Sequence, residues 1–132
     1  MAHFAQIDSD NTVTQVIVVA DSDAPNEAAG IAFCKSILGA DSNWVQTKED
    51  GSIRFRYTGI GMRYDSTNDV FYRQQPYGSW SLNTSTWVWE PPVALPDDAG
   101  YDDEENATVH IEYTWDEGST SWTNRTVIDL TE

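Results

Sequence analysis

The segment from Arg54 to Pro92 reads RFRYTGIGMRYDSTNDVFYRQQPYGSWSLNTSTWVWEPP, and it holds four of the seven basic residues and three of the six tryptophans. It contains a pattern in which an aromatic residue is followed by a polar loop and then by a second aromatic residue, seven positions after the first. The pattern occurs three times along the chain, as Tyr64–Phe71, Trp80–Trp87 and Trp115–Trp122. Aromatics at this spacing can form a cross-strand pair beside a hairpin turn, which stabilises a sheet by roughly 0.2–1 kcal/mol. The segment therefore predicts a hairpin unit that is repeated along the chain.

Upstream of this segment, the sequence predicts a further hairpin over residues 3–19. The β-rich runs HFAQI and TVTQVIVVA are joined by residues 8–11, whose Asp, Ser and Asn side chains favour a turn. The run Val16–Val19 has no polar alternation, which predicts a central strand covered on both faces.

A single helix is expected over residues 25–38, because apolar residues recur there at helical spacing and Gly39 follows as a stop signal. The expected apolar stripe consists of Ile31, Phe33, Cys34, Ile37 and Leu38. A helix this short is not stable alone, so we expect it to lie against a sheet.

The remaining chain predicts mainly strands. Residues 53–57 alternate cleanly, which predicts a strand with Arg54 and Arg56 on one face and the apolar residues on the other. Further strands or hairpins are expected over residues 44–47, 62–64, 70–73, 80–89, 109–115 and 121–130, with an acidic loop over about 96–107. The predicted fold is α+β: mainly antiparallel β-hairpins forming a sheet, with the helix on one face, in a single domain over residues 1–132.

Composition restricts the class of partner. The net charge of −15 over 132 residues argues against nucleic acid, which requires clustered Lys and Arg, and against an anionic membrane surface. The single cysteine excludes an internal disulfide. The opening MAHFAQIDSD lacks the basic and apolar regions of a secretory signal, so we expect synthesis in a cytoplasm.

Nothing in the sequence assembles into a catalytic set, so we expect no enzyme activity and no cofactor. His3 and His110 stand in no nucleophile or metal motif, and Cys34 lies on the apolar stripe of the helix. The run from Asp8 resembles the start of an EF-hand loop, but Val13 stands where the invariant glycine belongs. We therefore expect no metal site either.

Six residues are candidates for contact with a partner: Arg54, Arg56, Arg63, Arg73, Tyr77 and Trp89. Arginine favours bidentate pairing with carboxylates, and exposed aromatics are typical of interface hot spots. Trp89 is singled out because it shares a strand face with Trp87. The alternative for the arginines is internal pairing with the acidic loop or tail.

Several pieces of the chain resemble a family of small proteins of marine tailed bacteriophages, including phages of cyanobacteria, and they occur in the same order as in that family. They are MAHFAQID, VTQVIVVA, GIAFCKSILG, NWVQT, FRYTGIGMRYD, PYGSWSLN, WVWEPPVALPDD and YTWDEGSTSW. The resemblance implies a non-enzymatic protein located in the virion, and it brings no defined binding residues.

Together these features predict a virion structural protein that decorates or cements the capsid shell through aromatic and arginine contacts. Its partners would be the major capsid protein or tail components. Residues 90–132, with twelve acids and one arginine, are expected to face solvent. Two alternatives remain: a tail or fibre component, and a carbohydrate-binding module whose exposed tryptophans bind a host glycan.

Overall fold

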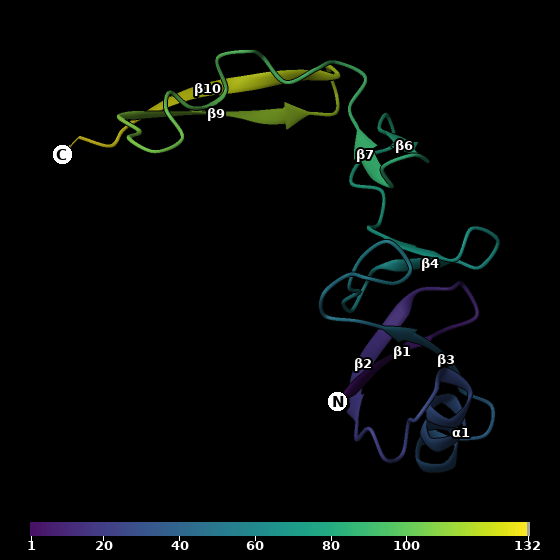
Figure 1. Cartoon of the computed structure of the whole chain (residues 1–132). Helices are drawn as coiled ribbons and strands as arrows, with labels where there is room; N and C mark the ends of the chain where they lie inside the picture. Colours follow the sequence, from purple (N-terminus) through teal and green to yellow (C-terminus); the bar gives the residue numbers. More distant parts are fainter. Residues whose placement is uncertain (132) are drawn as a thin grey trace. The chain divides into compact units, whose positions relative to one another are not determined.

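The structure is a computed structural model that describes residues 1–131 (Figure 1). Its elements are β1 (Ala2–Ile7), β2 (Val13–Val19), α1 (Glu27–Leu38), β3 (Asn43–Thr47), β4 (Arg63–Asp65), β5 (Val70–Tyr72), β6 (Ser81–Asn83), β7 (Val88–Glu90), β8 (Gly100–Tyr101), β9 (Val109–Asp116) and β10 (Ser121–Asp129). The α+β prediction is confirmed. The strands divide among four small sheets, in the orders β2-β1-β3, β10-β9-β8, β4-β5 and β6-β7, instead of joining in the one sheet that was expected.

The chain forms two compact units. The N-terminal unit contains Met1–Gln74 and Thr84–Val88, and the C-terminal unit contains Gln75–Asn83 and the chain from Trp89 onward. The prediction of a single domain over residues 1–132 stays a prediction, and its last residue lies outside the described part.

In the N-terminal unit, β1 is the central strand of a three-stranded antiparallel sheet. The first hairpin is confirmed: the Asp8 carboxylate accepts hydrogen bonds from the backbone N–H groups of Asp10 at 2.8 Å and Thr12 at 3.0 Å. The prediction that residues 16–19 form a central strand is wrong, because β2 lies at the edge and Val18 is 53% exposed. The run is apolar because β2 contributes to two separate clusters, one around Phe4 and the other around Phe71.

The helix α1 lies against β1 and β3 (Figure 1). Its N-cap is Asn26, whose side chain accepts from the Ala29 N–H at 2.9 Å, and it ends at Gly39, which has a φ of 118°. Gly30 and Cys34 are buried against the sheet. The expected stripe is too long: Ile37 and Leu38 are 56% and 45% exposed, so the last turn lies outside the core.

Residues 53–57 do not form a strand, which corrects the prediction made from their alternation. They belong to an irregular loop over residues 51–62, where Arg54 and Phe55 have positive φ angles of 51° and 75°. A bulky residue in this region is strained and persists only where its surroundings hold it. Here the Arg54 carbonyl accepts from the Phe71 N–H at 3.0 Å, and its side chain is held by ion pairs described below.

Two of the three aromatic pairs form as predicted. Tyr64 is opposite Phe71 in the β4–β5 pair, with ring centroids 5.2 Å apart. Trp115 is opposite Trp122 in the β9–β10 pair, with centroids 5.1 Å apart in an edge-to-face arrangement.

The prediction of the third pair, Trp80 with Trp87, is wrong. Both residues lie outside the short strands β6 and β7, and they belong to different units. Trp87 has a φ of 53°, is buried, and packs on Tyr72 at 5.9 Å. Trp80 instead contacts the Trp115–Trp122 pair.

The C-terminal unit is built on the long β9–β10 hairpin, with β8 added as a third strand. The acidic loop is organised by Asp102, whose carboxylate accepts from the N–H groups of Thr108 at 2.8 Å and Val109 at 2.9 Å. A hydrogen bond from the Thr108 hydroxyl, followed by these two from backbone N–H groups, lowers the pKa of Asp102 to about 2. The loop is therefore a folded turn that begins and ends beside β9.

Candidate functional site

Arg54, one of the six candidates, points into the N-terminal unit. Its guanidinium lies 2.9 Å from a Glu27 oxygen and 2.7 Å from Asp69, and it donates to the Gln46 carbonyl at 3.0 Å. The side chain is only 16% exposed. Burial disfavours its charge, yet the hydrogen bonds to Glu27, Asp69 and Tyr64 outweigh burial and raise the pKa of Arg54. Arg54 is therefore used internally, with partners other than the acidic loop or tail.

Arg63 is also engaged within the N-terminal unit. It donates to the Asp10 carbonyl at 2.9 Å and to the Tyr72 hydroxyl at 3.4 Å. Its backbone forms an isolated bridge with Thr12. Arg63 thus fastens β4 to the turn between β1 and β2.

Arg56 and Phe55 lie together on the surface of loop 51–62. Phe55 is 49% exposed, and the Arg56 guanidinium lies 5.3 Å from the centroid of its ring. Arg56 also donates to the Thr86 carbonyl at 3.0 Å. The strained backbone therefore presents an aromatic ring and a positive charge side by side, a combination that gives a cation–π contact.

Arg73 is the second positive charge at this surface. Partial burial, followed by the nearby positive charge of Arg73, lowers the pKa of Arg56. Two like charges close together on a surface favour an anionic partner, because each raises the potential at the other. We call the group Phe55, Arg56 and Arg73 the arginine–aromatic patch.

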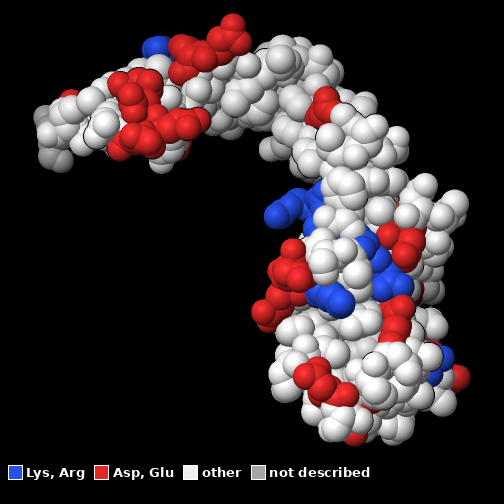
Figure 2. Space-filling view, viewed as in Figure 1, with Lys and Arg blue, Asp and Glu red and all other residues white. Residues whose placement is uncertain are grey.

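The basic residues are concentrated in the N-terminal unit, as the blue atoms in Figure 2 show. That unit has six basic and ten acidic residues, whereas the C-terminal unit has one basic and twelve acidic residues. The net charges are therefore −4 and −11. The patch is a local positive feature of a chain that is acidic in both units.

Tyr77 and Trp89 lie in the C-terminal unit, so the six candidates do not form one site. Tyr77 is exposed and its ring lies 5.9 Å from that of Trp80, while Trp89 is half-buried in β7. The structure brings together Arg56 and Arg73 and turns Arg54 and Arg63 to internal contacts. Phe55 was missed, because the alternation of residues 53–57 assigned it to a buried strand face.

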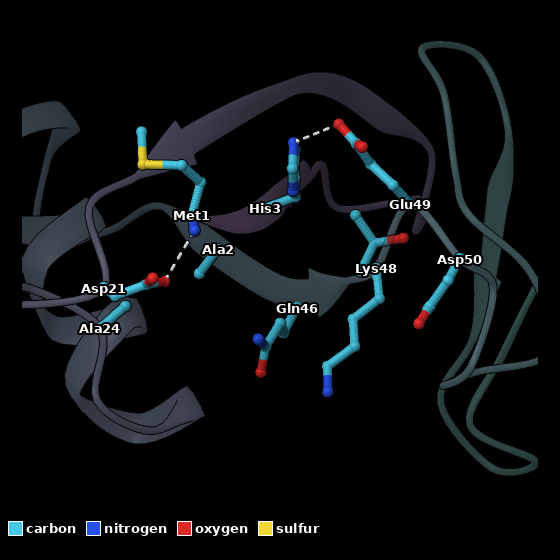
Figure 3. Close-up of a pocket in the computed structure, with 10 residues that line it drawn as sticks. Met1, Ala2, His3, Asp21, Ala24, Gln46, Lys48, Glu49 and Asp50 are labelled. Carbon is cyan, nitrogen blue, oxygen red and sulfur yellow. Dashed lines mark ion pairs between the residues drawn. The ribbon is translucent and has the colours of Figure 1, made fainter.

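A hollow of 430 Å³ lies beside the N-terminus (Figure 3). Its polar groups pair with one another: His3 lies 2.9 Å from Glu49, and the N-terminal ammonium lies 2.9 Å from Asp21. The Thr47 hydroxyl at its edge is buried and accepts from the Thr58 N–H at 3.1 Å. Lys48 extends past Gln46 along the hollow. These pairings tie the chain start to the segment after β2 and to the turn after β3.

Among residues 1–131, no group of three or more His, Cys, Asp or Glu side chains is placed to hold a metal ion. The helix found in this part of the chain lacks the length and apolar character needed to cross a membrane. A scan against protein-family models and searches of curated proteins and of solved structures found no match to the chain.

Proposed function

We propose that the protein is a non-enzymatic structural component of a bacteriophage particle, a decoration protein that docks on the capsid shell through the arginine–aromatic patch. The observation that carries this proposal is the exposed Phe55 ring with the Arg56 guanidinium above it, and with Arg73 near enough to Arg56 to act on its charge. The order and content of the segments that resemble phage proteins supply the virion setting. The protein would be made in the host cytoplasm and incorporated into the virion.

The patch has the properties of an interface anchor. Burying an exposed phenylalanine contributes about 1.5–3 kcal/mol, and Arg and aromatic residues are enriched at hot spots. The backbone at Phe55 is held in its strained conformation by the Arg54 contacts. Less conformational entropy is then lost on docking, because the loop is already ordered. A complementary surface would offer an apolar recess bordered by carboxylates.

The charge distribution favours one orientation of the protein on the capsid surface. The C-terminal unit, with a net charge of −11, is strongly hydrated and repels an acidic capsid surface. The positive patch on the N-terminal unit attracts the same surface. We therefore propose that the N-terminal unit docks and that the C-terminal unit is displayed.

Mass spectrometry of purified particles of the encoding phage tests the virion setting. We expect the protein in the particle at a copy number close to that of the major capsid protein. A few copies per particle would instead support a tail or fibre component, and complete absence would refute the proposal.

The docking surface is tested by adding purified protein to particles that lack it. We expect the double variant Arg56→Glu with Arg73→Glu to lose co-sedimentation with the particles while its circular dichroism spectrum shows that it remains folded. The matched control is Lys35→Glu with Lys48→Glu, which makes the same change in net charge away from the patch. Equal loss in both variants would show that overall charge, and not the patch, governs binding.

A further inference from the structure

The C-terminal unit contains a second hollow, which the proposed docking does not use. Its volume is 610 Å³, within the range of about 300–1,000 Å³ typical of ligand sites. It is lined by Trp80, Glu90, Pro91, Pro92, Ala94, Leu95 and Trp122. One carboxylate thus borders a floor that is otherwise aromatic and apolar.

The tryptophans of this floor belong to a packed cluster. The ring of Trp122 lies 6.2 Å from Trp80 and 5.1 Å from Trp115, both edge-to-face. The Trp122 indole N–H donates to the Val93 carbonyl at 2.9 Å, which fixes the chain that forms the rim. Edge-to-face packing of this kind holds rings in defined orientations.

The carboxylate of Glu117 holds the tryptophan cluster in place. Glu117 accepts from the Ser79 N–H at 2.9 Å, from the Ser79 hydroxyl at 2.6 Å and from the Trp115 indole N–H at 2.9 Å. The loop before β6 is thereby attached to the turn between β9 and β10. The hollow is preformed, which lowers the entropy lost when a ligand binds.

Polar groups lie along one side of the hollow. Glu90 accepts from the Asn83 side-chain amide at 2.5 Å. Glu90 and Pro91 also line a smaller hollow of 300 Å³, together with Ser81, Leu82 and Asn83. The aromatic floor is therefore bordered on one side by hydroxyl, amide and carboxylate groups.

We propose that this hollow binds a neutral sugar residue of a glycan, with its C–H face on Trp80 and Trp122 and its hydroxyls on Glu90 and Asn83. A sugar ring presents an apolar face and a polar edge, which the floor and the Glu90 side match. An apolar peptide side chain would match the floor alone and would remove water from the Glu90 carboxylate without offering it a hydrogen bond, which is costly.

The charge of the unit selects among glycans. Its one basic residue, Arg125, is paired with Asp98 at 2.8 Å, and the unit has a net charge of −11. Sialylated, sulfated or phosphorylated sugars would be repelled. The ligand class is therefore an uncharged hexose or N-acetylhexosamine oligosaccharide.

The test is titration of the full chain with uncharged oligosaccharides of glucose, galactose, mannose and N-acetylglucosamine, and with sialyllactose as the anionic counterpart. Tryptophan fluorescence and calorimetry report binding. We expect saturable binding of at least one uncharged sugar at millimolar or lower concentration and no binding of sialyllactose. No response to any uncharged sugar, or a preference for sialyllactose, would overturn the proposal.

Two variants locate the site. Glu90→Gln should weaken binding by at least about tenfold, as expected for hydrogen bonds to a charged acceptor, whereas Glu104→Gln in the acidic loop should not. Leu95→Asp places a charge in the hollow while every tryptophan of the cluster is kept, and it should abolish binding. Val127→Asp, which also replaces an exposed apolar residue, should leave binding unchanged. Unchanged binding in both Glu90→Gln and Leu95→Asp would refute the assignment of the binding site to this hollow. Because these assays use the isolated chain, their outcome is independent of the virion proposal.

Discussion

Arg54 and Glu27 form an ion pair of 2.9 Å between loop 51–62 and the first turn of α1. The same guanidinium contacts Asp69 and the Gln46 carbonyl, so four segments of the N-terminal unit meet at one side chain. This contact turns Arg54 inward and leaves Phe55 and Arg56 at the surface. A structural residue and a candidate binding residue are thus neighbours in sequence.

Replacing Arg54 should therefore lower stability. We expect Arg54→Ala to reduce the free energy of unfolding by about 2–4 kcal/mol, because Glu27 is left partly buried and without its cation. Chemical denaturation followed by tryptophan fluorescence measures the change. Lys48→Ala, a control at an exposed residue, should change it by less than about 0.5 kcal/mol. Similar values for the two variants would contradict the internal role of Arg54.

Gly30 in α1 should not tolerate a methyl group. A Cβ at this position would lie 2.0 Å from the Cζ atom of Phe4, which is fully buried and cannot move aside. Helix propensity alone favours alanine by about 1 kcal/mol, but overpacking reverses the sign, and we expect Gly30→Ala to lower stability by at least about 2 kcal/mol.

The matched control for this change is Gly59→Ala, where an added Cβ meets no atom within 4 Å. Thermal unfolding of the two variants should differ clearly, with Gly59→Ala close to the parent protein. A Gly30→Ala protein that is as stable as the parent would show that Phe4 does not pack on the helix as described.

The parts of the fold that follow from local signals were predictable. Asn26 and Gly39 bound the helix because capping depends on a few adjacent residues, and the Tyr64–Phe71 and Trp115–Trp122 pairs follow from hairpin geometry. The position of β2 was not predictable in this way. Strand order depends on which segments meet at long range, and an apolar run is equally consistent with an edge strand that contributes to two clusters.

The candidate site was only partly predictable, for a similar reason. The alternation of residues 53–57 is typical of a strand, and the positive φ angles of Arg54 and Phe55 arise from contacts with distant residues. Arg56 and Arg73 were identified from charge alone. The hollow beside Trp122 could not be inferred, because its rim comes from segments that are separated along the chain.

Cys34 should be protected from thiol reagents. It is fully buried between α1 and the sheet, and burial raises the pKa of its thiol, so the reactive thiolate is disfavoured. We expect modification by a chromogenic disulfide to be slow in buffer and fast in denaturant. Equally fast reaction in both conditions would contradict its place in the core.

The tryptophan cluster should loosen in acid through Glu117. The hydrogen bonds from Ser79, and then that from Trp115, lower the pKa of Glu117 below its usual value of 4.5. A carboxyl whose folded pKa is depressed contributes stability that is fully present above the unfolded pKa and is lost as pH falls through the folded pKa. The near-UV circular dichroism of the cluster should therefore decrease as the pH falls below about 4.5.

The variant Glu117→Gln separates this effect from that of the other carboxylates, including Asp102. Glutamine accepts fewer and weaker hydrogen bonds than a carboxylate, so we expect a reduced near-UV signal at neutral pH and a weaker dependence on pH between about 5 and 3. Glu104→Gln, which removes a charge from the acidic loop, should keep the pH profile of the parent protein. A Glu117→Gln profile identical to that of the parent would mean that protonation of other carboxylates loosens the cluster.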